Sequence, residues 1–128
     1  MLWTKQNTST KTTKQLGDFT EELASNFLQK QGLTFVAKNV HCRQGELDLI
    51  MNDGNTFVFV EVKYRKSTQF GGAISAVSAA KQTKVKHCVT FYLQQQGLNE
   101  YNTPCRIDVV ALQGNIEQPD ITWIKNAF

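Results

Sequence analysis

Residues 45–65 read GELDLIMNDGNTFVFVEVKYR, and their pattern is the strongest indication of the fold in this sequence. Apolar and polar residues alternate over residues 46–51 and again over residues 56–64, which is typical of β-strands with one buried face. The turn signal NDGN, residues 52–55, stands between them. Two alternating runs around an Asp-Gly turn predict an antiparallel β-hairpin.

The turn determines which side chains face one another across this hairpin. We place Asp53 and Gly54 at the two turn positions, so that Glu46 is expected opposite Glu61. Side chains alternate between the two faces of a strand. One face is expected to carry Glu46, Asp48, Ile50, Phe57, Phe59, Glu61 and Lys63, and the other Leu47, Leu49, Met51, Val58, Val60 and Val62.

The first of these faces gathers three carboxylates and one ammonium at one end. Like charges opposite one another destabilise a sheet, so the carboxylates need a proton or a cation, and Lys63 offsets only one of them. Mg²⁺ or Mn²⁺ suits such a site, because hard divalent ions take carboxylate oxygens and keep several waters. The alternative is a solvent-facing sheet surface with a Glu–Lys pair. However, Phe57 and Phe59 share this face, which indicates that part of it is covered.

The segments around the hairpin complete an α/β pattern. Apolar residues at helical spacing predict one helix over residues 16–31, which Gly32 ends, and another over residues 75–95. Further strands are expected at residues 33–42, 105–112 and 121–125, and loops at residues 67–72 and 114–119. The order α-β-β-β-α-β-β predicts a mixed central β-sheet flanked by helices, in which the second helix joins two parallel strands.

Length and composition suit one globular domain. The chain has 128 residues, 41% of them hydrophobic and 20% charged, which allows a sizeable core. We expect a flexible N-terminal tail over residues 1–15, rich in Thr, Lys and Gln, and a single domain over residues 16–128. No long apolar run or signal segment stands in the sequence, which predicts no membrane partner.

The cysteines predict no disulfide. The chain has three, Cys42, Cys88 and Cys105. Their odd number and the lack of a CxxC motif argue against a disulfide framework, so reduced thiols in a cytoplasmic protein are expected. His41 beside Cys42 is weak support for a zinc site, because no partners stand at ligand spacing.

The basic residues are unevenly distributed. The net charge is +3, yet residues 62–99 carry six Lys or Arg and no acidic residue, which leaves eight basic and eleven acidic residues elsewhere. A basic block beside an acidic cluster suits an enzyme that binds phosphates, and a solvated basic face is the alternative. The candidates for phosphate contacts are Arg65, Lys66, Lys81 and Lys84. The two last lie on the apolar stripe of the second helix, where lysines also extend to the edge without any ligand.

Three further features are interpreted as structural. Arg106 and Asp108 share one face of their strand, which favours a salt bridge. Trp123 and Phe128 are expected in the core or at a docked terminus. Stacking of Trp123 on a nucleobase is the alternative.

The hairpin motifs GELDLI (residues 45–50) and FVEVKYR (residues 59–65) resemble those of the YraN-like family of uncharacterised bacterial proteins. Further matches, in the same order, are Gly17, Glu21, Ala24, Lys81, the run RIDVV at residues 106–110 and the ending NAF at residues 126–128. That family belongs to the PD-(D/E)XK nuclease-like superfamily, which includes restriction enzymes and Holliday-junction resolvases. The resemblance covers residues 17–128 and implies a restriction-endonuclease-like core.

The resemblance also implies a set of site residues. Asp48 and Glu61 correspond to the metal-binding acids of the superfamily, and Lys63 to the lysine of its E-x-K motif. A glutamate of the first helix often completes such sites and corresponds to Glu21, and Glu46 is expected to act through the surroundings of the metal or a bound water. Helical geometry alone does not separate Glu21 from its neighbour Glu22. The sequence departs from the usual pattern in having Leu47 where the superfamily has proline and Thr20 where the family has glycine.

These residues predict an Mg²⁺- or Mn²⁺-dependent endonuclease that hydrolyses phosphodiester bonds in DNA, with branched and single-stranded DNA as candidate substrates. The alternative is a non-catalytic nucleic-acid-binding or scaffold protein that retains the nuclease fold. The intact Asp48, Glu61 and Lys63 favour the nuclease. The modest net charge favours a small footprint on the nucleic acid or a partner, as in a homodimer.

Overall fold

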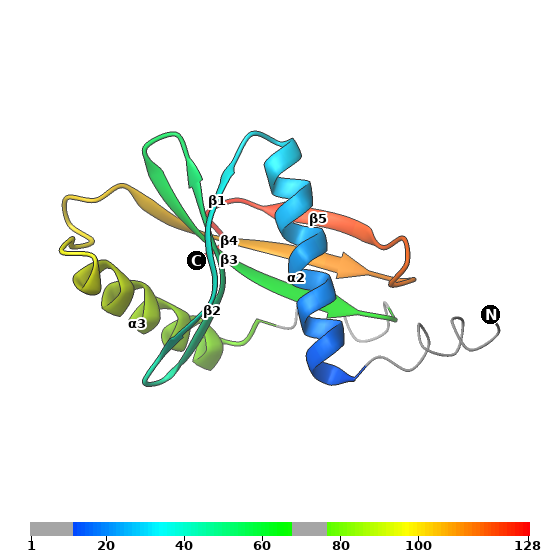
Figure 1. Ribbon diagram of the computed structural model, residues 1–128. Helices are drawn as coiled ribbons and strands as arrows, with labels where there is room; N and C mark the ends of the chain where they lie inside the picture. Colours follow the sequence, from blue (N-terminus) through cyan, green and yellow to red (C-terminus); the bar gives the residue numbers. More distant parts are fainter. Residues whose placement is uncertain (1–11, 68–76) are drawn as a thin grey trace.

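A computed structural model describes residues 12–67 and 77–128 of the chain (Figure 1). Its elements are α2 (Thr13–Lys30), β1 (Thr34–Cys42), β2 (Gly45–Asp53), β3 (Thr56–Arg65), α3 (Ala79–Gln95), β4 (Cys105–Gln113) and β5 (Asp120–Ile124). The strands form one sheet in the order β1-β2-β3-β4-β5. The fold is therefore the predicted α/β class, a mixed sheet flanked by helices.

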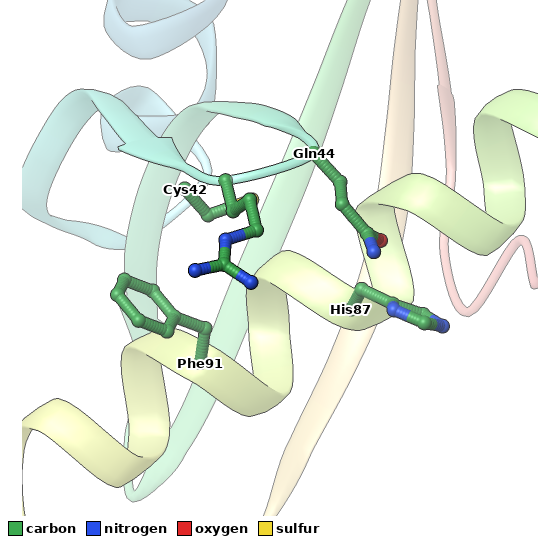
Figure 2. Close-up of a pocket in the computed structure, with 5 residues that line it drawn as sticks. Cys42, Gln44, His87 and Phe91 are labelled. Atoms are coloured by element: carbon green, nitrogen blue, oxygen red, sulfur yellow. The ribbon is translucent and has the colours of Figure 1, made fainter.

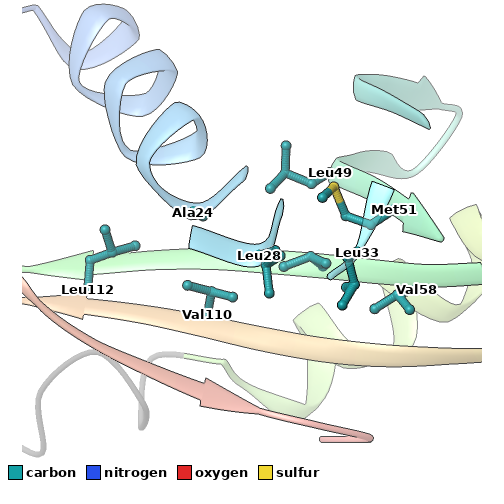
Figure 3. Packing of buried hydrophobic residues seen from close by; sticks show 9 residues of the cluster. Ala24, Leu28, Leu33, Leu49, Met51, Val58, Val110 and Leu112 are labelled. Atoms are coloured by element: carbon teal, nitrogen blue, oxygen red, sulfur yellow. The ribbon is translucent and has the colours of Figure 1, made fainter. Parts of the chain in front are cut away.

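The two helices cover opposite faces of the sheet (Figure 1). On one face, Ala24 and Leu28 of α2 pack against strand side chains that point to the same side of the sheet, as Figure 3 shows. We call this group the α2 cluster. These strand residues are Leu49, Met51, Val58, Val60, Val110 and Leu112. On the other face, α3 packs against Ile50, Phe59 and Ile107, whose side chains point to the opposite side of the sheet. We call this group the α3 cluster. Both faces of the sheet are buried because its strands are apolar on both sides in their middle.

Strand β3 lies in the middle of the sheet. It pairs antiparallel with β2 and parallel with β4, and α3 is the predicted helix that joins the parallel strands. Antiparallel β1 and β5 form the two edges. A polar side chain in the middle of β3 is therefore enclosed by neighbours on both sides, which matters for Glu61.

The helix boundaries differ from the predicted ones by a few residues. Helix α2 begins at Thr13 because Thr12 and Gln15 form a capping box, so residues 12–15 do not belong to a tail. Gly32, with a φ of 102°, follows its end as predicted. Helix α3 begins at Ala79 behind the N-cap Ser78, later than expected. The predictions for residues 1–11, 68–72 and 75–76 concern segments outside the described residues.

The predicted register of the hairpin was wrong by two residues. Asp53 pairs with Thr56, so the turn residues are Gly54 and Asn55. Gly54 has a φ of 62°, and glycine tolerates a positive φ at the first turn position better than the aspartate we placed there. A shift of two residues by itself moves no side chain to the other face of its strand. It moves Asp48, instead of Glu46, to the position opposite Glu61.

Alternation along β2 is broken at one point. Leu47 packs with the α3 cluster instead of the α2 cluster that holds Leu49, so its predicted face was wrong. The partner strand explains this, because Asn39 has a φ of 51° between the pairs Lys38–Leu49 and Val40–Leu47. A residue in the left-handed region interrupts a β-ladder and changes the direction of the chain.

The expectation of three reduced thiols was also wrong. Cys42 at the end of β1 and Cys88 on α3 are joined by a disulfide, with their Cα atoms 5.6 Å apart, and Cys105 is a free thiol. The two joined cysteines are 46 residues apart. The number of cysteines and their spacing in the sequence do not show which of them lie close together in the fold. The odd count therefore did not exclude a disulfide.

The predicted salt bridge between Arg106 and Asp108 is confirmed. Arg106 Nε lies 3.0 Å from Asp108 Oδ1, and the fully buried Asp108 also accepts hydrogen bonds from Trp123 Nε1 and from the backbone N–H of Asn126, each 2.9 Å long. Trp123 packs beside the α2 cluster and Phe128 beside the α3 cluster, as predicted. Asp108 therefore ties β4 to the C-terminal segment.

Neither helix of the described residues is long and apolar enough to cross a membrane.

Candidate functional site

The candidate site lies where β2 parts from β3. The paired residues of the two strands end at Leu49 and Val60. Beyond this point the backbone N–H of Val62 donates to Asp48 Oδ2, 2.9 Å away, instead of to a carbonyl of β2. The Asp48 carboxylate thus replaces a backbone acceptor, which holds it in place with only 8% of its surface exposed.

Glu61 of β3 lies beside Asp48 and is 2% exposed. Burial raises the pKa of its carboxyl from 4.5 to about 8, and the charge of Asp48 and a hydrogen bond between the two side chains add to the rise. The ammonium groups of Lys81 and Lys63 oppose it. Their Nζ atoms lie 3.4 Å and 4.0 Å from Glu61 Oε1. The two buried carboxyls are therefore hydrogen-bonded to each other, with two lysine ammonium groups beside them.

Helix α2 adds Glu21 to this group. Burial raises the pKa of Glu21 to about 7, and the charges of Asp48, Glu46 and Asp18 add to the rise. A hydrogen bond with the Asn39 side chain opposes it. Its neighbour Glu22 is exposed, so the structure separates the two glutamates that the sequence left open.

Two carboxyl oxygens of this group have unused acceptor capacity. Oε1 of Glu21 and Oε1 of Glu61 are both buried without a hydrogen bond, although Glu61 Oε1 keeps its ion pairs with the two lysines. Buried oxygens of this kind are costly unless a donor or a cation meets them. This fits a group of carboxyls that binds a cation.

Glu46 lies at the margin. Its Oε2 is 3.5 Å from His41 Nδ1, and its side chain is 36% exposed. It acts on Glu21 through its charge, while His41 has Glu46 as its carboxylate neighbour and forms no zinc site with Cys42, which is in the disulfide. Glu46 is therefore near the buried pair without belonging to it.

The basic candidates divide into two groups. Lys63 and Lys81 are half-buried and reach Glu61, so Lys81, predicted to contact nucleic acid, has a carboxylate partner inside the protein. Arg65, Lys66 and Lys84 are exposed. The Arg65 guanidinium donates to the backbone carbonyl of Tyr64.

The donor set is small. Within residues 12–67 and 77–128, no three His, Cys, Asp or Glu side chains are grouped closely enough to hold a metal ion by themselves. Two adjacent carboxyls, Asp48 and Glu61, remain. This number suits Mg²⁺, which is usually bound by one or two carboxylates, several waters and substrate phosphates.

Asn39 is the site residue that the sequence analysis missed. It has the unusual φ of 51° in an edge strand and reaches Glu21. Asparagine enters the left-handed region more readily than other non-glycine residues, so an Asn in a predicted strand was the only available signal. Such outliers cluster at functional sites.

Comparisons with known proteins agree on one family. The sequence profile of the uncharacterised protein family UPF0102 matches residues 20–112. A UPF0102 protein of Colwellia psychrerythraea is 65% identical over 130 residues, covering the whole of both chains. UPF0102 proteins of Aeromonas hydrophila and Neisseria gonorrhoeae are 47% and 49% identical, over 88% and 83% of this chain and 83% and 88% of theirs. None of these names states an activity. The predicted YraN-like family is thereby confirmed, and the chain belongs to the uncharacterised protein family UPF0102.

Proposed function

We propose that the protein is a metal-dependent nuclease that hydrolyses phosphodiester bonds in DNA. One observation carries the proposal: two hydrogen-bonded, buried carboxyls, Asp48 and Glu61, lie at a fork between strands with two lysines beside them. Perturbed carboxyls next to cations are typical of catalytic sites. A purely structural pair would be fully hydrogen-bonded, whereas Glu61 retains a buried oxygen without a hydrogen bond.

Asp48 and Glu61 are the residues that would hold Mg²⁺ or Mn²⁺. Bound there, the ion lowers the pKa of a water and offsets negative charge on a phosphate. Asp48 is already fixed by the Val62 N–H and needs little reorganisation. Glu61 must lose its proton to bind a cation, and its lysine neighbours favour that loss.

The lysines supply positive charge for the phosphate. Lys63 and Lys81 both extend to Glu61 Oε1, so their ammonium groups stand where negative charge would develop on the reacting phosphate. Cations held in advance at such a position stabilise a transition state without reorganisation. We assign Lys63 the role of orienting the attacking water or the developing oxyanion.

Glu21 is assigned the transfer of a proton. A pKa of about 7 suits a general base near neutral pH, since it balances the deprotonated fraction against basicity. Its Oε1 is buried without a hydrogen bond and so retains a lone pair for a water. Arg65, Lys66 and Lys84, which are exposed, are assigned to flanking phosphates.

A cleavage assay tests the proposal. The purified protein is incubated with Mg²⁺, Mn²⁺ or EDTA and with linear, single-stranded, flapped and four-way DNA. We expect cleavage of at least one form with metal and none with EDTA. Asp48→Asn should abolish it, while the matched change Asp120→Asn, at the exposed first residue of β5, should not. Cleavage that persists in Asp48→Asn at the wild-type rate would show that a contaminant or another site is responsible.

One observation favours a second candidate, a nucleic-acid-binding protein without turnover. Lys81 and Lys63 already bring positive charge to Glu61, so the buried carboxyls have cationic neighbours without a metal. This candidate predicts that DNA binding is the same with Mg²⁺ and EDTA and is unchanged by Asp48→Asn.

A further inference from the structure

A small pocket lies between the β1–β2 turn and the middle of α3, outside the carboxyl site. Cys42, Arg43, Gln44, His87 and Phe91 line it, and its volume is about 150 Å³. Figure 2 shows His87 and Phe91 on successive turns of α3, facing the turn that carries Cys42 and Gln44. Small-molecule sites usually measure roughly 300–1,000 Å³. A pocket of this size suits one flat ring rather than a whole cofactor.

The lining combines one aromatic face with cationic and neutral donors. Phe91 is 39% exposed, a large share for a phenylalanine. Arg43 brings a guanidinium that binds phosphate in two-pronged geometry, and His87 and Gln44 bring further hydrogen-bonding groups. None of the five lining residues carries a carboxylate. The ligand that fits these groups has a flat ring and a negative charge.

The pocket is connected to the carboxyl site by two elements. The turn that carries Arg43 continues directly into β2, on which Asp48 lies. Helix α3 places Lys81 against Glu61 and Phe91 in the pocket, and the helical rise from one residue to the other, ten positions along, is about 15 Å. At the duplex rise of about 3.4 Å per nucleotide, that distance corresponds to roughly four nucleotides of a base-paired strand.

Exposed side chains continue this path along α3. Lys84, His87 and Phe91 stand at i, i+3 and i+7, which is one face of a helix. Lys84 and His87 are exposed. A basic groove with an aromatic side chain is the arrangement by which proteins hold single strands.

We infer that this pocket binds an unpaired nucleotide of the substrate strand, with its base on the ring of Phe91 and its phosphate on Arg43 and His87. The inference rests on the proposed function and names the form of DNA that the site takes, one with a single-stranded segment about four nucleotides from the cleaved bond. Stacking on an aromatic ring accepts every base, so the pocket adds no sequence preference. The Cys42–Cys88 disulfide joins the two walls and holds the pocket preformed.

Binding measurements with a fluorescent base test this inference. A single-stranded oligonucleotide that contains 2-aminopurine and a blunt duplex of the same sequence are titrated with the wild-type protein, in Ca²⁺ and in EDTA. Stacking of the base should quench its fluorescence. Phe91→Leu keeps an apolar side chain of similar bulk and removes the ring. It should abolish the quenching and weaken single-strand binding roughly 5- to 150-fold, with little change for the duplex.

Matched variants separate stacking from charge. Arg43→Gln should lower the salt dependence of single-strand binding by about 0.7 in the log–log slope. Phe35→Leu, a change of another exposed phenylalanine at the start of β1, and Lys30→Gln, at the exposed end of α2, should leave both quantities unchanged.

The outcomes distinguish the two proposals. A wild type that binds and cleaves DNA, but whose binding and quenching survive Phe91→Leu, overturns the pocket and leaves the nuclease standing. Quenching that Phe91→Leu abolishes, in a protein that cleaves no DNA, supports the pocket and contradicts the nuclease. A wild type that binds neither oligonucleotide overturns the pocket, while the cleavage assay on flapped and four-way DNA decides the nuclease separately.

Discussion

The stability of the protein should fall as the pH rises when no divalent cation is present, and Glu61 should cause most of the fall. Its carboxyl has an ordinary pKa of 4.5 when unfolded and about 8 when folded. A group whose pKa is raised by folding contributes stability that is fully present below the unfolded pKa. That contribution is lost as the pH rises from about 4.5 through about 8.

The magnitude follows from the size of the shift. Each pKa unit corresponds to about 1.4 kcal/mol, so the rise from 4.5 to about 8 amounts to several kcal/mol. Glu61 is 2% exposed, and solvent screening therefore reduces this little. For a small domain whose total stability is roughly 5–15 kcal/mol, the effect is a large fraction of the whole.

Glu61→Gln isolates this contribution, because the amide has nearly the same shape as the protonated carboxyl and does not titrate. The free energy of unfolding is measured by urea denaturation in EDTA, followed by tryptophan fluorescence, at intervals from pH 4 to 9. We expect the variant to match the wild type near pH 4 and to exceed it by several kcal/mol at pH 9. The control Glu22→Gln, at the exposed neighbour of Glu21, should follow the wild type throughout.

Two results would contradict this prediction. If the wild type and Glu61→Gln lose stability equally between pH 4.5 and pH 8, Glu61 is not the buried acid that the structure shows. If the wild type gains stability over this range, the sign of the shift is wrong and the lysines outweigh burial.

Four further predictions concern the site and its frame. Asp48→Asn should stay folded, since it relieves repulsion between carboxyls, yet lose the rise in melting temperature that Mg²⁺ or Mn²⁺ produces in the wild type; an unchanged rise would exclude Asp48 as a ligand. Lys63→Ala should lose cleavage at least tenfold and keep that rise, as scanning fluorimetry beside the cleavage assay would show. Asn39→Gly permits the φ of 51° but removes the hydrogen bond that lowers the pKa of Glu21, so the acidic limb of the pH–rate profile should move to higher pH; a limb that stays in place would separate Asn39 from Glu21. Cys88→Ser opens the disulfide across 46 residues and should cost roughly 2–4 kcal/mol in urea denaturation, and equal stability would show that the bond is unimportant.

The order and type of the elements could be predicted because they depend on local patterns. Alternation over two runs predicted β2 and β3, and spacing of three and four residues predicted α2 and α3. Their ends were less certain, since a single cap such as Thr12 moves the start of a helix. The parallel pairing of β3 with β4 followed from the helix between them.

The details of the site depended on contacts that no local pattern records. The segment NDGN allows two different pairs of turn residues, and the choice of Gly54 and Asn55 decided that Asp48 lies opposite Glu61. The predicted and observed registers differ from each other by two residues, so the error in register did not by itself change the predicted face of any side chain. The role of Asn39 and the Cys42–Cys88 disulfide could not be predicted in this way, since each depends on the position of β1 in the folded protein.

The cluster of buried carboxyls could be found from sequence because it interrupts the apolar pattern that is expected of a buried strand. A buried central strand should be apolar on both faces, and β3 satisfies this until Glu61, which lies beside another acid and is almost fully buried. Such a position raises the pKa and costs stability at neutral pH, as the raised values of Glu61 and Glu21 show. The lysines beside Glu61 and the hydrogen bond between Asn39 and Glu21 recover only part of that cost, since both pKa values stay raised and an oxygen of each glutamate remains without a hydrogen bond. Conflicts between local and global requirements of this kind are found chiefly at functional sites. A second carboxyl pair in the same fold shows the contrast, because Asp53 and Asp108 are both held by Arg106 and have a structural explanation.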